Sequence, residues 1–182
     1  MKKLSILVLA LFLFTLAAEA QKANDKLASQ IRNSKIKLTS DGGSSKLMAV
    51  AENFTDAEAK AAKVMAMNFA IGFFYPGQTL ERMPNDLLLT FWVMSKKPAF
   101  AERHSLTFYV DGDEIMAGDA RYSSRARENM EYLNFQVSRD VLVKIASTSN
   151  VHFRLGDATF KFSNDQMRMI ADLLELSDPL NN

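Results

Sequence analysis

The sequence predicts an α+β fold that is mainly antiparallel β, a sandwich or curved sheet of about seven or eight strands, with short helices and a C-terminal capping helix. Three observations predict this class. Apolar and polar residues alternate in short segments, and Gly, Asp and Pro turns separate these segments. After Ser163 the apolar spacing becomes helical. The chain has 182 residues, 48% of them hydrophobic, which is enough for one core.

The first 20 residues have the pattern of a secretory signal peptide. Lys2 and Lys3 precede an apolar run over 4–16, and Ala-Glu-Ala at 18–20 matches a small-x-small cleavage site. We therefore expect cleavage near Ala20 and a periplasmic or extracellular location. Because no later apolar run approaches the roughly 20 residues of a membrane helix, we expect no membrane span in the mature chain.

Charge and cysteine content exclude several classes of function. Removal of the signal peptide takes two of the 22 basic residues and one of the 21 acidic residues, so the mature chain has no formal net charge. Nucleic-acid binders normally show a clear basic excess, so we expect no nucleic-acid partner. The chain has no cysteine, which excludes disulfides, thiolate metal sites, a cysteine nucleophile and a lipid-modified N-terminal cysteine.

The composition changes along the chain and predicts its organisation. Residues after the signal peptide are polar and contain an Asp-Gly-Gly-Ser-Ser loop sequence, whereas apolar density is high from Lys46 onward. The predicted parts are a signal peptide at 1–20, a polar N-terminal arm at 21–45 with an edge strand near 35–39, a single β-rich domain at 46–176 and a tail at 177–182.

Residues 55–75 combine two patterns. Thr55 and Glu58 form a capping box before good helix formers, which predicts a short helix at 55–62. Every second residue from 65 to 75 is large and apolar, which predicts a strand at 64–75. Helix propensity alone favours one helix over 56–71. Large apolar residues at every second position would then lie on all sides of that helix, so we prefer the strand.

The rest of the chain predicts strands and two further helices. Residues 87–94 are apolar on both faces except at Thr90, so we expect a strand covered on both sides with Trp92 in the core. An exposed Trp92 would instead indicate a carbohydrate or protein contact. The remaining predicted elements are a hairpin of 105–110 with 114–122, a strand over 133–137, a helix capped by Ser138, a hairpin of 151–155 with 158–162, and a helix capped by Ser163.

Two groups of polar residues are candidate sites. Asp111 and Asp113 offer oxygen ligands for a hard cation such as calcium, although EF-hand spacing is absent and a hairpin turn accounts for the same residues. A second group combines planar guanidinium groups, which suit carboxylates and phosphates, with a tyrosine. Its members are Arg121, Tyr122, Arg125 and Arg127. This group suggests an acidic glycan or an envelope protein as partner, or a solvated loop balanced by Glu128 and Glu131.

Catalytic motifs are absent from the sequence. It has no G-x-S-x-G, P-loop or G-x-G-x-x-G pattern, and the S-x-x-K match at 34–37 has no K-T-G partner. We therefore expect no cofactor and favour a non-catalytic binding or structural module of the bacterial cell envelope. The alternative is a small exported hydrolase or metal-dependent enzyme centred on His104, Asp111 and Asp113, which requires these residues to converge.

Residues from about 69 to 174 resemble a loosely defined group of uncharacterised exported bacterial proteins. The resemblance rests on the segments Tyr-Pro-Gly at 75–77, Leu-Thr-Phe-Tyr-Val-Asp-Gly at 106–112, Leu-Val-Lys-Ile-Ala at 142–146, Val-His-Phe-Arg-Leu-Gly at 151–156, and the cap region at 160–166. Many similar proteins are lipoproteins, and this chain departs from them because it has no cysteine to acylate. The resemblance implies a β-rich exported domain and nothing catalytic.

Overall fold

Two antiparallel sheets form the body of the protein in a computed structural model that describes residues 27–41, 43–51 and 54–179. The six-stranded sheet has the order β1 (Ile36–Ser40), β2 (Ser44–Ala51), β3 (Ala66–Pro76), β4 (Asp86–Met94), β8 (Met130–Ser138) and β7 (Arg121–Arg125). The four-stranded sheet has the order β10 (Ala158–Lys161), β9 (Val151–Leu155), β5 (Ser105–Val110) and β6 (Asp113–Asp119). The predicted α+β, mainly antiparallel class is confirmed.

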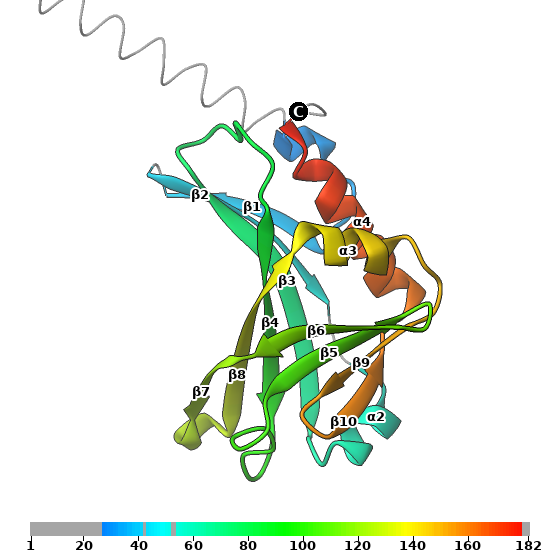
Figure 1. Cartoon of the computed structure of the whole chain (residues 1–182). Helices are drawn as coiled ribbons and strands as arrows, with labels where there is room; N and C mark the ends of the chain where they lie inside the picture. Colours follow the sequence, from blue (N-terminus) through cyan, green and yellow to red (C-terminus); the bar gives the residue numbers. More distant parts are fainter. Residues whose placement is uncertain (1–26, 42, 52–53, 180–182) are drawn as a thin grey trace, which may run out of the picture.

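The six-stranded sheet has one covered and one uncovered face. The four-stranded sheet crosses its lower half, and helices α3 (Arg139–Ala146) and α4 (Asn164–Leu176) lie beside its upper half (Figure 1). We call the side chains directed toward these elements the inner face and those on the opposite side the outer face. Helix α2 (Asp56–Ala61) contacts β3 and β10 at the lower end.

Period-2 alternation builds the inner face. In β3 the predicted apolar residues from Met67 to Tyr75 are all buried. Phenylalanines from both sheets then meet in one cluster, in which Phe153 of β9 lies 4.8 Å from Phe162 and 5.3 Å from Phe91 of β4, measured between ring centroids. Aromatic rings bury large areas and favour tilted contacts of this kind, so this cluster is the main link between the sheets.

Local capping signals place the helices where the sequence predicts them. Thr55 and Ser163 form capping boxes with Glu58 and Gln166, and Ser138 caps α3. At the other end of α4, the guanidinium of Arg139 donates to the carbonyl oxygen of Leu174 at 2.8 Å and to the hydroxyl of Ser177. Burial lowers the pKa of this guanidinium. These contacts satisfy acceptors that a helix end leaves open.

Two sequence predictions about the strands are wrong. Strand β4 is not covered on both sides, because Leu88 and Met94 on its outer face are 41% and 39% exposed. The predicted strand 114–122 is divided at Ala120, where the chain passes from β6 in one sheet to β7 in the other. A register shift against β5 and the positive φ of Gly118 (88°) mark a bulge, and bulges bend strands in this way.

The described part of the predicted N-terminal arm contacts the domain. Strand β1 lies where the edge strand is predicted and pairs with β2 along its length. Leu27 and Ile36 are buried in the core. The predicted signal peptide lies outside the described residues, as do residues 180–182. No helix in the described part of the chain is long and apolar enough to cross a membrane.

Candidate functional site

The outer face carries an unusual mixture of aromatic, amide and basic side chains. Its register follows from the strand pairing, because side chains opposite one another across a sheet lie on the same face. One row across the sheet places Asn68, Trp92, Tyr132 and Ser123 side by side. Within the described residues, the four-stranded sheet and the helices pack on the inner face instead. This row is therefore accessible to a ligand.

Basic residues occupy the two lateral edges of the outer face. Lys37 and Lys46 lie on β1 and β2, while Arg121 and Arg125 lie on β7. Among the strand residues of this face, Asp86 is the one acidic residue. A chain with a formal net charge of only +1 thus concentrates positive charge on one face. Such a face attracts anionic ligands.

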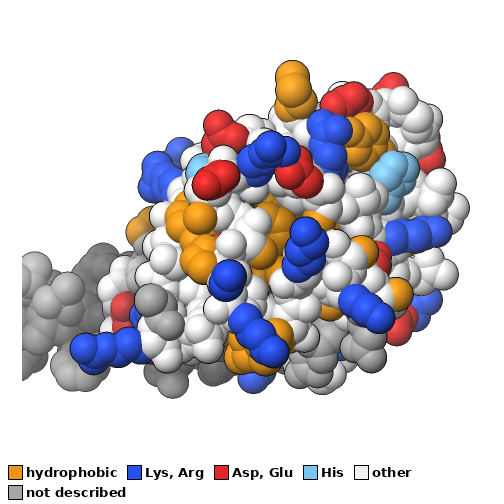
Figure 2. Space-filling model, turned by 90° about the horizontal axis from the view of Figure 1, so that it is seen from below, with side chains coloured by type: hydrophobic (Ala, Val, Ile, Leu, Met, Phe, Trp, Pro, Cys, Tyr) orange, Lys and Arg blue, Asp and Glu red, His pale blue; other side chains and the backbone are white. Residues whose placement is uncertain are grey.

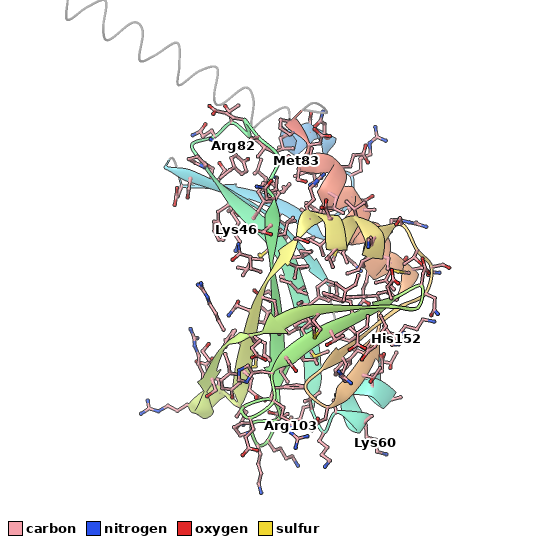
Figure 3. All side chains as sticks on the ribbon, in the orientation of Figure 1. Lys46, Lys60, Arg82, Met83, Arg103 and His152 are labelled. Carbon is pink, nitrogen blue, oxygen red and sulfur yellow. The ribbon has the colours of Figure 1, made fainter. Side chains whose placement is uncertain are left out.

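Cation–π contacts order two of these basic side chains. The ammonium of Lys46 lies 5.2 Å from the ring centroid of Phe74, and the guanidinium carbon of Arg125 lies 5.4 Å from that of Tyr132. Both cations are therefore attracted toward rings of the sheet, although the side chain of Arg125 stays exposed and also pairs with Glu128. Figure 3 shows Lys46 beside the upper part of the sheet.

Hydrogen bonds orient the amides of this face. The hydroxyl of Thr90 donates to the side-chain oxygen of Asn134 at 2.8 Å, and the amide of Gln136 donates to Asp86 at 3.0 Å. Asn134 in turn donates to the carbonyl oxygen of Arg121 at 3.4 Å. Because these contacts restrict rotation, the amides form a preorganised polar surface beside the aromatic row.

The predicted basic group is divided between two sides of β7. Arg121 and Arg125 lie on the outer face, and Arg127 lies in the exposed 3-10 turn Ala126–Glu128. Tyr122 faces the other way, where its ring stacks on His104 with centroids 5.6 Å apart. Burial is the main cause that raises the pKa of its phenol. Strand geometry explains the division, because successive side chains alternate between faces.

Glu131 is buried, so it does not balance the exposed arginines at the surface, as the interpretation of a solvated loop requires. It is 2% exposed and accepts hydrogen bonds from the backbone amides of Ala99 (2.8 Å) and Phe100 (2.9 Å). The hydroxyls of Ser95 and Tyr122 donate to the same carboxylate at 2.9 and 3.2 Å. Four donors thus satisfy the buried carboxylate. Because the donors Ala99 and Phe100 belong to the β4–β5 loop, Glu131 also attaches this loop to β8.

The polar residues of the enzyme hypothesis do not converge. Asp111 and Asp113 lie at the β5–β6 turn, where Asp111 and Gly112 have positive φ (51° and 93°), and the hydroxyl of Thr148 donates to Asp111. His104 precedes β5 at the opposite end of this strand. Because a six-residue strand is about 20 Å long, the backbone of His104 lies about that far from the turn aspartates. No group of three potential metal ligands occurs within the described residues.

Sequence reasoning missed the central residues of this site. It placed Trp92 in the core because β4 is apolar on both faces, and it did not consider Tyr132 or Asn134. The period-2 pattern identifies two faces of a strand, but it does not tell which is covered. No protein-family model, curated protein or solved structure matches this chain.

Proposed function

We propose that the protein is an exported, non-catalytic binding module of the bacterial cell envelope whose outer face binds an acidic glycan. The observation that carries this proposal is the row of Asn68, Trp92 and Tyr132 beside Arg121 and Arg125. The separation of His104 from the two turn aspartates supports binding rather than catalysis.

The chemistry of the outer face suits an acidic glycan. The partly exposed rings of Trp92 and Tyr132 offer apolar surface on which the C–H faces of sugar rings can pack, while their polar edges stay hydrated. The oriented amides of Asn134 and Gln136 supply donors and acceptors for hydroxyl groups. Arginine forks bind carboxylates in a planar, bidentate way, which suits sugar acids better than neutral sugars.

The spacing of the charges suits a polymer rather than a small anion. Arg121 and Arg125 are four residues apart on one strand, so their backbone positions are separated by about 13 Å. Lys37 and Lys46 lie at the opposite edge of the same sheet. Lys37 and Lys46 lie two and three rows along the strands from the aromatic row, so an acidic chain that crosses the sheet obliquely would contact this row and basic residues at both edges.

The fluorescence of Trp92 tests this proposal directly, because the chain has one tryptophan. We expect a saturable change in emission when the protein purified after export is titrated with an acidic glycan such as a polyuronate. A neutral glycan of similar length should give a much weaker response, since it cannot use the arginines. Equal responses to both glycans would contradict the role of charge.

Matched variants separate specific binding from general electrostatics. Arg121→Glu with Arg125→Glu should weaken polyuronate binding at least about tenfold, because two charge-assisted contacts are lost. Arg154→Glu with Arg168→Glu makes the same charge change at exposed positions on β9 and α4, away from the outer face, and should leave binding nearly unchanged. Saturable binding of polyglutamate without any response to polyuronate would identify an acidic protein as the partner instead.

A further inference from the structure

The lower end of the molecule combines exposed lysines with exposed methionines. We call this surface the lower tip, and we define it by Lys63, Met65, Met94, Lys96, Lys97 and Arg127. Its parts come from separate chain segments that meet there. The backbone amide of Met65 donates to the carbonyl oxygen of Met94 at 2.7 Å, and that of Ser95 donates to Asn129 at 3.0 Å. Figure 2 shows this end with lysines and arginines among apolar and acidic side chains.

Basic residues outnumber acidic ones at the lower tip, where Glu102 and Asp157 line the cleft beside Lys63 and exposed Glu128 follows Arg127. Lys63, Lys96, Lys97 and Arg127 are all exposed. The ion pairs between described residues join Arg103 to Asp157, Arg125 to Glu128 and Arg154 to Glu114, so none of them neutralises the four basic residues of the tip. Lys60 and Arg103 lie at the same end (Figure 3). The positive charge of the tip is therefore available to an external anion.

Apolar side chains lie among these charges. Met65 is 56% exposed, a high fraction for a residue that continues the apolar series of β3. Met94 and Met130 are cross-strand neighbours in the last row of the outer face. Methionine is flexible and polarisable, so it adapts to irregular apolar surroundings. An exposed cluster of methionines within a basic surface is typical of an interaction site rather than of a solvated face.

The loop that presents two of the lysines is held by a buried carboxylate. Glu131 binds Ser95 and the backbone amides of Ala99 and Phe100, so residues 96–98 lie between fixed points. Pro98 borders a cleft of about 670 Å³ with Lys63 on one side, and another cleft with Lys96 and Arg125 on the other. The lysines therefore sit on an anchored loop, which reduces the entropy lost on binding.

We propose that the lower tip binds the surface of an anionic lipid bilayer as a peripheral contact. Lysines are compact charges that attract acidic headgroups without requiring a defined bidentate geometry, and the methionines can enter the boundary between headgroups and acyl chains. A tip of loops and turns that protrudes from the end of the strands fits a broad surface better than a small ligand. The two sites adjoin at one cleft, which Lys96 and Arg125 line together, while Trp92 and Arg121 lie farther along the outer face.

Vesicle co-sedimentation tests this inference with the protein purified after export, its processed N-terminus verified by mass spectrometry. We expect retention on vesicles of phosphatidylcholine with about one-third phosphatidylglycerol, and little on phosphatidylcholine alone. Retention should fall as salt is raised, because screening shortens the range of the lysine charges. Equal retention on both vesicles would overturn the proposal.

Charge-reversal variants locate the contact. Lys63→Glu, Lys96→Glu and Lys97→Glu together should weaken binding to the anionic vesicles at least about tenfold. The same charge change at Lys35, Lys144 and Arg168, which are exposed elsewhere, should have little effect. Equal losses in the two triple variants would overturn the proposal, because binding would then follow net charge. Lys63→Glu with Lys97→Glu, which leaves Lys96 beside Arg125 unchanged, should keep the Trp92 response to polyuronate, so failure of the lipid site is distinguishable from failure of the glycan site.

Discussion

The two faces of the six-stranded sheet are built by the same strands and differ in burial. Phe91 and Trp92 are adjacent in β4, yet Phe91 is fully buried on the inner face while Trp92 is partly exposed on the outer face. The inner face packs against a second sheet and two helices, which together form the core. The outer face keeps aromatic and apolar side chains, and among the described residues no second sheet covers them. Large apolar residues on this face bury less of their surface than those on the inner face, so we expect them to stabilise the fold less.

The largest expected effect comes from placing a charge on the covered side. Phe162→Asp and Leu173→Asp put a carboxylate at positions that are 2% and 0% exposed, where no partner is available. We expect each variant to fail to fold, as measured by the loss of a cooperative thermal transition followed by circular dichroism. A melt near that of the wild type would show that these positions are not in the core.

Phe91 and Trp92, which are adjacent in β4, test the difference in burial between the two faces most directly. Phe91→Ala should lower the free energy of unfolding by about 3–5 kcal/mol, because it opens a cavity among packed rings. Trp92→Ala should lower it by no more than about 1.5 kcal/mol, although the side chain is larger, because one side of the ring already faces solvent. Urea unfolding measures both values. Similar losses in the two variants would mean that the outer face is covered.

Glu131 is a buried charged residue on the inner face, and its loss should have an intermediate effect. Glu131→Ala leaves two backbone amides and the hydroxyl of Ser95 without their acceptor, which should cost about 2–3 kcal/mol. The β4–β5 loop should also become sensitive to limited proteolysis. Glu128→Ala is the matched control, because this exposed neighbour pairs with Arg125 at the surface and should change stability little. A stable, protease-resistant Glu131→Ala variant would exclude the anchoring role.

The smallest effect should arise at the turn between β1 and β2. Backbone amides of Ser44 and Gly43 donate to Asp41 and hold the pKa of its carboxyl below 3.8, its ordinary value. A lowered pKa in the folded state contributes stability above pH 3.8 that is lost as the pH falls through the folded value. Asp41→Asn should therefore melt slightly below the wild type at pH 7, with a smaller difference at pH 3. A difference that grows on acidification would contradict this.

Several elements could be predicted because their signals are local. The capping boxes at Thr55 and Ser163 each depend on residues three positions apart, and both helices begin where these boxes lie. The strand at 64–75 was predicted against helix propensity because alternation over many residues outweighs it. The turn at Asp111 and Gly112 follows from backbone preferences of those two residues.

The candidate site was predicted only in part. Arg121 and Arg125 were identified by residue type, and they do lie together on the outer face. Tyr122 and Arg127 were grouped with them by proximity in the sequence, but strand alternation and the following turn direct them elsewhere. Their partners on the outer face, Tyr132 and Trp92, are 7 and 33 positions from Arg125, and no local pattern joins residues at such separations.

The sequence alone determined the class of the fold, the positions of most strands and helices, and the two arginines of the outer face. These properties depend on periodicity, caps and turns, whose energies arise between residues close in the chain. Only the tertiary structure decided which side of β4 is covered, why Glu131 is buried, and which residues join the basic lower tip. Burial depends on segments distant in sequence, as when the amides of Ala99 and Phe100 meet a carboxylate more than 30 residues away. Such contacts form only when the sheets and loops pack together.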